Sequence, residues 1–369
     1  MAAATNPGPP REHLVGPRAD GWLTGWLAVA LWIASWVATR AGHPIGSLGM
    51  PLYWPVATLS AMHFGMTYHV AYAGGIAAVR RRPFALAIGP ALLCVALGAI
   101  VVLSAFDGPV ETRRATELAI LSVYVLTTWH YVKQVYGVAR IGARYRNIGL
   151  SARDARVLRF GLYPLWAMGA AQVLTRTGGS RFAGFSVGVR LLPSGVSPLL
   201  RIAAWVCAAT IAWVIVASSR RAGVRPPALM VAPYLAAFLW ITAPVDFYGG
   251  FLALGALHGL QYLACCRRAE TSLGLQSLSR RTALRWAELF GGAACGGLLI
   301  STWMPGFLNR RFGVDGAPLL YTAVFFVFLN LHHYLIDAVI WRSNGSVVRS
   351  MTGSTPRHAL RPAFEPSPA

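Results

Sequence analysis

Residues 317–341 read APLLYTAVFFVFLNLHHYLIDAVIW, and this stretch decides the class of fold. It is apolar over most of its length and is followed directly by Arg342. A helix of about 20 mostly apolar residues can cross the hydrocarbon core of a bilayer. The stretch also holds His332, His333 and Asp337, and ionisable side chains inside a membrane helix generally face the protein interior and mark a functional site. It therefore predicts a membrane-spanning helix that carries part of a buried site.

Nine further segments have the same apolar character. The ten predicted spans are residues 21–39, 52–79, 83–106, 115–139, 157–175, 198–218, 227–243, 247–266, 286–304 and 317–341. The composition agrees, with 56% hydrophobic residues, 12% charged residues and a mean hydropathy of +0.52. We therefore predict an all-α integral membrane protein with about ten transmembrane helices in one polytopic domain, residues 21–342. Residues 1–20 and 343–369 are expected to be disordered cytosolic tails, and residues 177–197 a loop or an interfacial element.

The formal net charge of +21 comes almost entirely from arginines in short segments between the apolar stretches. No basic domain remains that could read a nucleic acid, so the bilayer is the expected partner and nucleic acid is not. With the N-terminus inside, the cytosolic tails and loops hold 23 of the 32 arginines. The positive-inside rule therefore predicts a protein of the cell (inner) membrane with both termini in the cytosol.

Six of the nine histidines lie in predicted spans, on four different helices: His63, His69, His130, His258, His332 and His333. On each of these helices one histidine precedes the terminal arginine by nine to eleven residues, which is about 14–17 Å along the axis. The predicted topology gives these helices one direction, so their imidazoles form a layer at one depth. We therefore predict a metal site. His63 and His69 are too far apart on one helix to bind the same ion together, and the choice within this pair and between His332 and His333 stays open.

Polar and aromatic residues on the same helices are expected to support this site. Candidates for holding the second imidazole nitrogen lie about one turn from a histidine on the same helix face: Gln134, Tyr262, Asn330 and Asp337. Candidates for lining a substrate tunnel are Trp129, Tyr131 and Tyr334. The strings His130-Tyr131-x-x-Gln134 and His333-Tyr334-x-x-Asp337 share a pattern that weakly indicates an internal repeat. Lys133 is expected to extend toward the lipid headgroups.

Two strings in this chain resemble segments of the bacterial Brp/Blh family: His63-Phe64-Gly65-Met66-Thr67, and the run from His332 to Arg342, HHYLIDAVIWR. This remote resemblance implies a multi-helix membrane enzyme that binds iron through histidines on separate helices and cleaves β-carotene to retinal with O2. The chain departs from the family pattern at two early aspartates, which are absent, and at one histidine, which is replaced by Tyr262. The string match places the last ligand on His332, whereas helix periodicity pairs His333 with Asp337. We therefore expect this chain to share the family's metal binding more readily than its substrate, β-carotene.

The sequence thus predicts a membrane metalloenzyme, a non-haem iron oxygenase or related oxidoreductase. Histidine-bound Fe(II) would activate O2 for the oxidation or cleavage of a lipophilic substrate such as a carotenoid, a retinoid or another lipid. Cu and Zn are alternative ions. Two other functions stay open, an intramembrane haem redox protein with axial histidines and a proton- or metal-coupled transporter.

Overall fold

The computed structural model describes residues 13–43, 50–106, 109–175, 181–187, 191–243, 247–272, 281–342 and 345–352. Helices make up 83% of the structure. The first half contains α1 (Ala19–Gly21), η1 (Trp22–Trp26), α2 (Leu27–Arg40), α3 (Met50–Tyr72), α4 (Gly75–Arg81), η3 (Phe84–Ile88), α5 (Gly89–Phe106), α6 (Pro109–Tyr145), α7 (Ala152–Phe160), α8 (Tyr163–Leu174), β1 (Arg181–Phe182) and β2 (Phe185–Ser186). The second half contains α9 (Val196–Arg221), α10 (Ala228–Thr242), α11 (Phe247–Ser272), α12 (Arg281–Leu298), η4 (Leu299–Trp303), α13 (Met304–Arg311), α14 (Leu320–Ile340) and α15 (Ser346–Thr352).

The predicted helical class is confirmed, and the described chain has the apolar helices of a membrane protein. By length and composition, four helical stretches in this part of the chain could cross a membrane: Ala19–Arg40, Phe84–Ser104, Val196–Arg221 and Leu320–Ile340. A fifth apolar helix, Ala228–Thr242, is shorter. These stretches coincide with predicted spans, while a total of ten spans stays a prediction.

Several predicted segments have different boundaries in the structure. The segment expected at residues 52–79 is broken after Tyr72. The next helix, α4, begins at Gly75, whose φ of +54° suits glycine. The segment expected at 157–175 is divided into α7 and α8, and the 12 residues of α8 extend only about 18 Å. By contrast, α6 continues beyond residue 139, where the predicted span ends, as far as Tyr145. Within residues 177–197, β1 and β2 form a two-stranded antiparallel hairpin.

Both predicted tails contain ordered residues, which corrects part of the expectation of disorder. The Asp20 carboxylate accepts hydrogen bonds from the backbone N–H groups of Leu14, Val15 and Gly16, and Leu14 is buried. At the other end of the chain, α15 buries Val347 and Met351 on one helix face. Residues 1–12 and 353–369 of the predicted tails lie outside the described residues. Hydrogen bonds to Asp20 and the burial of apolar side chains therefore order the parts of the tails that adjoin the bundle.

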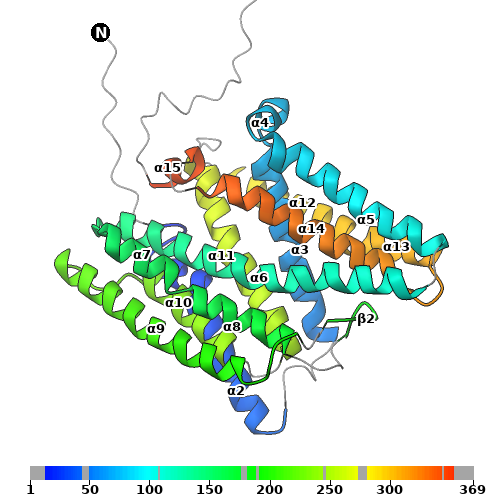
Figure 1. The fold of residues 1–369 in the computed structure, drawn as a ribbon. Helices are drawn as coiled ribbons and strands as arrows, with labels where there is room; N and C mark the ends of the chain where they lie inside the picture. The colour runs from blue at the N-terminus through cyan, green and yellow to red at the C-terminus, as the bar shows by residue number, and fades with distance from the viewer. Residues whose placement is uncertain are drawn as a thin grey trace, which may run out of the picture.

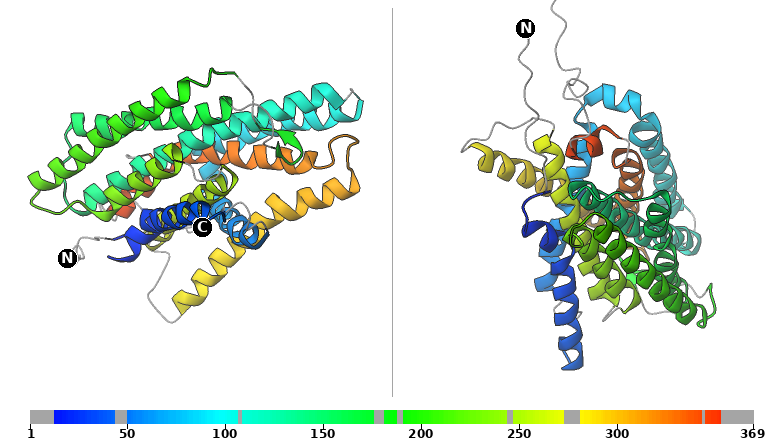
Figure 2. Two further views of the ribbon diagram at one scale, coloured as in Figure 1. Left: turned by 90° about the horizontal axis from the view of Figure 1, so that it is seen from below. Right: turned by 90° about the vertical axis from the view of Figure 1, so that its left-hand side faces the viewer.

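The helices α3, α6, α11 and α14 form the centre of the bundle, where α11 and α14 both contact α3 and α14 contacts α6. Figure 1 shows α6 and α14 running across the view while α3 and α11 cross them. Figure 2 shows α12 beside α3 on one side of the bundle and α8 with α9 on the other side. A single apolar cluster contains residues from the C-terminal halves of all four central helices together with α15. The C-terminal halves of the four helices therefore converge on one another beside α15.

Candidate metal centre

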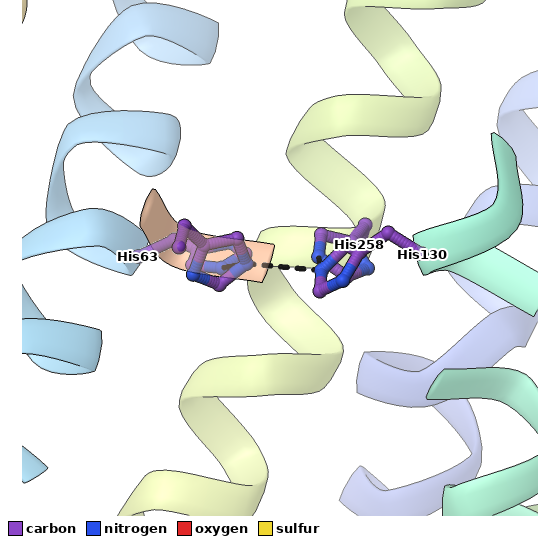
Figure 3. A group of neighbouring side chains, drawn as sticks. His63, His130 and His258 are labelled. Carbon is purple, nitrogen blue, oxygen red and sulfur yellow. Dashed lines mark hydrogen bonds between the residues drawn. The ribbon is translucent and has the colours of Figure 1, made fainter. Parts of the chain in front are cut away.

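Four histidines meet where the central helices cross: His63 of α3, His130 of α6, His258 of α11 and His333 of α14. Each offers a ring nitrogen, and these four nitrogens all lie within 4.8 Å of one another. Their residues are 4%, 7%, 7% and 1% exposed, in the same order. Figure 3 shows the rings of His63, His130 and His258 pointing toward one another from three separate helices. This arrangement is a candidate metal centre built from the middle turns of the bundle.

The distances within the cluster match ligands at right angles around one ion. The Nε2 atoms of His63 and His333 are 3.0 Å apart, and those of His333 and His130 and of His130 and His258 are each 2.9 Å apart. At a metal–nitrogen distance of about 2.1 Å, nitrogens at right angles are about 3.0 Å apart, and nitrogens at the tetrahedral angle are about 3.4 Å apart. The three short contacts therefore fit right angles better than tetrahedral ones.

The ring positions support the same geometry. The centroid separations of four neighbouring pairs are 4.4 Å (His63 and His333), 4.6 Å (His333 and His130), 4.6 Å (His130 and His258) and 4.8 Å (His258 and His63). The remaining pair with a defined separation, His258 and His333, is 6.4 Å apart. A tetrahedral set would give equal separations, whereas the longer distance here has the length of a square's diagonal. The four imidazoles are therefore arranged more like a square than a tetrahedron.

Thr67 determines which ring nitrogen of His333 carries the proton. The Thr67 hydroxyl donates its hydrogen to the carbonyl oxygen of His63, at 3.0 Å. The same hydroxyl oxygen lies 3.1 Å from Nδ1 of His333, so it accepts a hydrogen bond from that nitrogen. His333 therefore carries its proton on Nδ1, and its Nε2 presents a lone pair to the centre. Such a bond to the outer nitrogen is the usual device that orients a metal-binding imidazole.

Neutral rings cannot turn all three short Nε2 contacts of the cluster into good hydrogen bonds at once. His333 Nε2 has one lone pair, yet it lies within hydrogen-bonding distance of both His63 Nε2 and His130 Nε2. A neutral imidazole offers one donor and one acceptor, and this lone pair cannot accept two in-plane hydrogen bonds well. One cation at the middle of the four nitrogens would receive all four lone pairs at once. The donor set therefore fits a metal ion.

A carboxylate lies beside the four nitrogens. Asp337 Oδ2 is 3.6 Å from His130 Nε2 and 3.5 Å from His333 Nε2, while the Tyr262 hydroxyl donates to Asp337 Oδ1 at 3.1 Å. Asp337 thus approaches the inner nitrogens rather than the outer Nδ1 of His333, which Thr67 occupies. This position differs from the predicted one, because the i+4 spacing fixes the helix face but not which ring nitrogen is contacted. A negative charge here offsets the charge of a bound cation.

Aromatic rings surround the imidazoles and keep the centre apolar. The ring of Tyr262 stacks on His63 at 4.3 Å, and that of Tyr334 stacks on His130 at 4.7 Å. Tyr131 packs against His258 at 4.5 Å. Two of the predicted tunnel residues, Tyr131 and Tyr334, therefore contact the site directly. The third, Trp129, instead packs against Tyr163 and Trp166.

The structure separates the two open histidine pairs. His69 lies outside the cluster, with its Nε2 3.3 Å from Glu270 Oε1. His332 faces another neighbour set, where its Nδ1 lies 3.0 Å from the Tyr68 hydroxyl and its Nε2 3.2 Å from the Ala85 carbonyl. His63 and His333 are therefore the members that join His130 and His258. The histidine of this pair that joins the cluster is His333, which helix periodicity pairs with Asp337, and not His332, on which the family string places the last ligand.

Two polar residues expected to hold imidazole nitrogens have other partners. The Gln134 amide donates to the backbone carbonyl of His258 and to the side chain of Gln261, each at 3.0 Å. Asn330 accepts a hydrogen bond from the Tyr334 hydroxyl at 3.3 Å. Both residues therefore position elements of the site rather than its ring nitrogens. Thr67 was not among the predicted residues, although its place one turn after His63 was the available signal.

The chain matches no protein-family model, no curated protein and no solved structure. The chemistry of the site is therefore argued from its own residues.

Proposed function

We propose that this chain is a membrane-embedded non-haem metalloenzyme that uses O2 to oxidise or cleave a lipophilic substrate. His63, His130, His258 and His333 would hold an iron ion, which when bound supplies the positions and electrons for O2 activation. The protein would lie in the inner membrane with both termini in the cytosol. The observation that carries this proposal is the convergence of four buried ring nitrogens whose short contacts cannot all be hydrogen bonds between neutral rings.

The arrangement of the four imidazoles argues against zinc and haem and is compatible with iron or copper. Zinc sites built by histidines are generally tetrahedral, which the square-like ring arrangement does not fit. In a haem, four porphyrin nitrogens occupy the positions around the iron that histidines of four helices occupy here, so axial ligation of a haem is disfavoured. Copper(II) accepts a tetragonal nitrogen set and is the competing ion. Iron is proposed over copper because of the remote Brp/Blh resemblance.

The chain's own residues would prepare the site for this chemistry. Thr67 holds the His333 proton on Nδ1 and so keeps Nε2 free to bind. Asp337, held by Tyr262, balances positive charge in an apolar interior where an unpaired ion is costly. Tyr131 and Tyr334 exclude water beside the imidazoles, and Trp129 lines a cavity beside the centre that could hold an unsaturated chain. The remote Brp/Blh resemblance supports a polyene as the first substrate class to test.

Expression in cells that accumulate a carotenoid tests this function. The wild-type chain is expected to deplete the coloured polyene under air and to leave it unchanged without O2. His333→Gln should abolish the loss, and His332→Gln, at the adjacent residue outside the cluster, should retain it. A pool that stays constant with the wild-type chain under air would contradict a polyene substrate. Equal depletion by His333→Gln and the wild type would contradict the metal-dependent mechanism.

A further inference from the structure

A cavity of about 370 Å³ leads from the candidate metal centre toward the arginine-rich end of the bundle. Its lining includes His130, Tyr262 and Asp337 at the centre, and Arg140 and Arg144 further along α6. Ten residues separate His130 from Arg140, which corresponds to about 15 Å along the helix. The volume lies within the usual range for small-molecule sites, about 300–1,000 Å³. The cavity can therefore hold a ligand with one end at the imidazoles and the other among the arginines.

The outer part of this cavity is strongly cationic. The lining of the whole cavity contains five cationic side chains: Lys133, Arg140, Arg144, Arg159 and Arg342. The four arginines lie in its outer part. Asp337 is the only acidic residue in the lining, and it lies at the metal centre. Among the described residues, none of these five cations forms a salt bridge with a carboxylate. Arginines with free N–H groups bind carboxylates and phosphates through charge-assisted hydrogen bonds.

Between these two ends the lining is apolar and aromatic, with Trp129, Leu162 and Tyr163 among its residues. Lys133 lies between the ends, with its Nζ 6.0 Å from the centroid of the Trp129 ring. A ligand that is apolar throughout would leave the cations without a partner, and a small anion would leave the apolar walls without one. Only a molecule with an acidic headgroup and an apolar chain matches the whole cavity.

We propose that this cavity binds an anionic amphiphile, with its acidic headgroup held by Arg140, Arg144 and their neighbours and its chain directed at the four histidines. The role of this ligand as a substrate rests on the proposed function, while the binding site itself rests on the cavity alone. The headgroup chemistry is a carboxylate or a phosphate, supplied either by a free lipid acid or by an anionic phospholipid of the bilayer.

Photolabelling tests the binding site. The probes are dodecanoate with a diazirine at the end of its chain and the matching alcohol, added to the full chain in phosphatidylcholine nanodiscs. Dodecanoate is expected to label peptides around His130, and the alcohol to label them weakly. The double variant Arg140→Gln/Arg144→Gln should reduce labelling by dodecanoate about tenfold or more, because it removes charge-assisted hydrogen bonds. The matched control Arg80→Gln/Arg81→Gln changes arginines of α4 outside the cavity and should label like the wild type.

Three results would overturn the proposal. These are equal labelling by the acid and the alcohol, undiminished labelling of the Arg140→Gln/Arg144→Gln variant, and labelling placed away from the residues around His130. Unchanged weak labelling by the alcohol shows that the double variant is folded. Competition by added phosphatidylglycerol supports the proposal with a bilayer lipid as the source, and lack of competition supports it with a free acid.

The same assay separates this inference from the proposed function. Labelling is expected to persist after metal removal with a chelator, because the arginines anchor the probe. A chain that holds no metal but still binds dodecanoate would refute the proposed function and leave the amphiphile site intact. A chain that holds metal but shows no preference for the acid would refute only the amphiphile site.

Discussion

The hydroxyl group of Thr67 links two of the four helices that build the centre. It donates to a carbonyl of its own helix α3 and accepts from the Nδ1–H of His333 on α14. The orientation of His333 therefore depends on a residue that would not itself touch a bound ion. Groups in this position generally fix the orientation of the ring, and their loss lowers the metal affinity.

Thr67→Val keeps the size of the side chain and removes the acceptor for His333. Metal affinity is expected to fall roughly 10–100-fold, the usual effect of losing such a partner. Competition with a chromophoric chelator measures this affinity. Thr210→Val is the matched control, since the Thr210 hydroxyl also bonds the carbonyl four residues earlier but has no imidazole partner in the structure. Equal affinities of the Thr67→Val variant and the wild type would show that Thr67 does not set the tautomer.

Asp337→Asn removes the negative charge beside the inner nitrogens while it keeps the side chain's shape. We expect metal affinity to fall at least about tenfold, because a cation in a site of low dielectric loses its counter-charge. Tyr262→Phe, which removes only the hydrogen bond to Asp337, should have a smaller effect. The same chelator competition measures both affinities. A larger loss of metal affinity in Tyr262→Phe than in Asp337→Asn would contradict this role of Asp337.

At the scale of elements, α3 is held against α12 by close contact of small residues. A Cβ atom added at Gly65 of α3 would meet the backbone of Ala293, and one added at Gly297 of α12 would meet the backbone of Ala61. The two points of contact on α3, Ala61 and Gly65, lie on either side of His63. Both contacts therefore set the distance between α3 and α12. Close backbone approach through small residues is the common way for membrane helices to associate.

Gly297→Ala should therefore destabilise the protein, by about 1–3 kcal/mol for forced overpacking. Its control is the adjacent Gly296→Ala, where an added Cβ meets nothing within 4 Å. That change should be neutral or slightly stabilising, since alanine favours helix over glycine by about 1 kcal/mol. Thermal unfolding in detergent compares the two. A Gly297→Ala variant as stable as the Gly296→Ala variant would show that α3 and α12 are not closely packed there.

Hydrophobic runs predicted where most helices lie, but not where they break. The apolar run at 157–175 continues across the junction of α7 and α8 because its composition does not change there. The break depends instead on local features, Gly161 at the C-cap of α7 and Pro164 in the first turn of α8. Similarly, the run that contains α4 is apolar enough to continue, and a glycine at positive φ redirects it.

The site was predictable to the extent that it depends on helix faces and depth. Counting residues to the terminal arginines indicated the right helices, and periodicity paired His333 with Asp337. The same count placed His69 rather than His63 in the layer, because it treats helices as parallel rods. In the structure α3 and α11 cross α6 and α14 (Figure 1). The α3 histidine that joins the cluster is His63, six residues or about 1.7 turns before His69. Crossing geometry depends on packing between helices, which a single sequence does not reveal.

At the scale of the whole molecule, the arginine-rich ends of the central helices gather around α15. Both Tyr145 of α6 and Arg268 of α11 donate to the carbonyl oxygen of Met351. We expect this end to face the cytosol, with the tip between α13 and α14 outside. In a cysteine-free background, a membrane-impermeant maleimide should label Asp315→Cys on intact cells and Arg225→Cys only after permeabilisation; both native residues are exposed. The reverse labelling would refute the proposed orientation.

The central claim is that His63, His130, His258 and His333 bind one metal ion. Its most direct test is the metal content of the detergent-purified full chain, measured by plasma mass spectrometry for the wild type, His333→Gln and His332→Gln. This account predicts stoichiometric iron in the wild type and in His332→Gln, and its loss in His333→Gln. A wild-type chain free of transition metal after purification from iron-replete cells, or an equal metal content in the two variants, would contradict it.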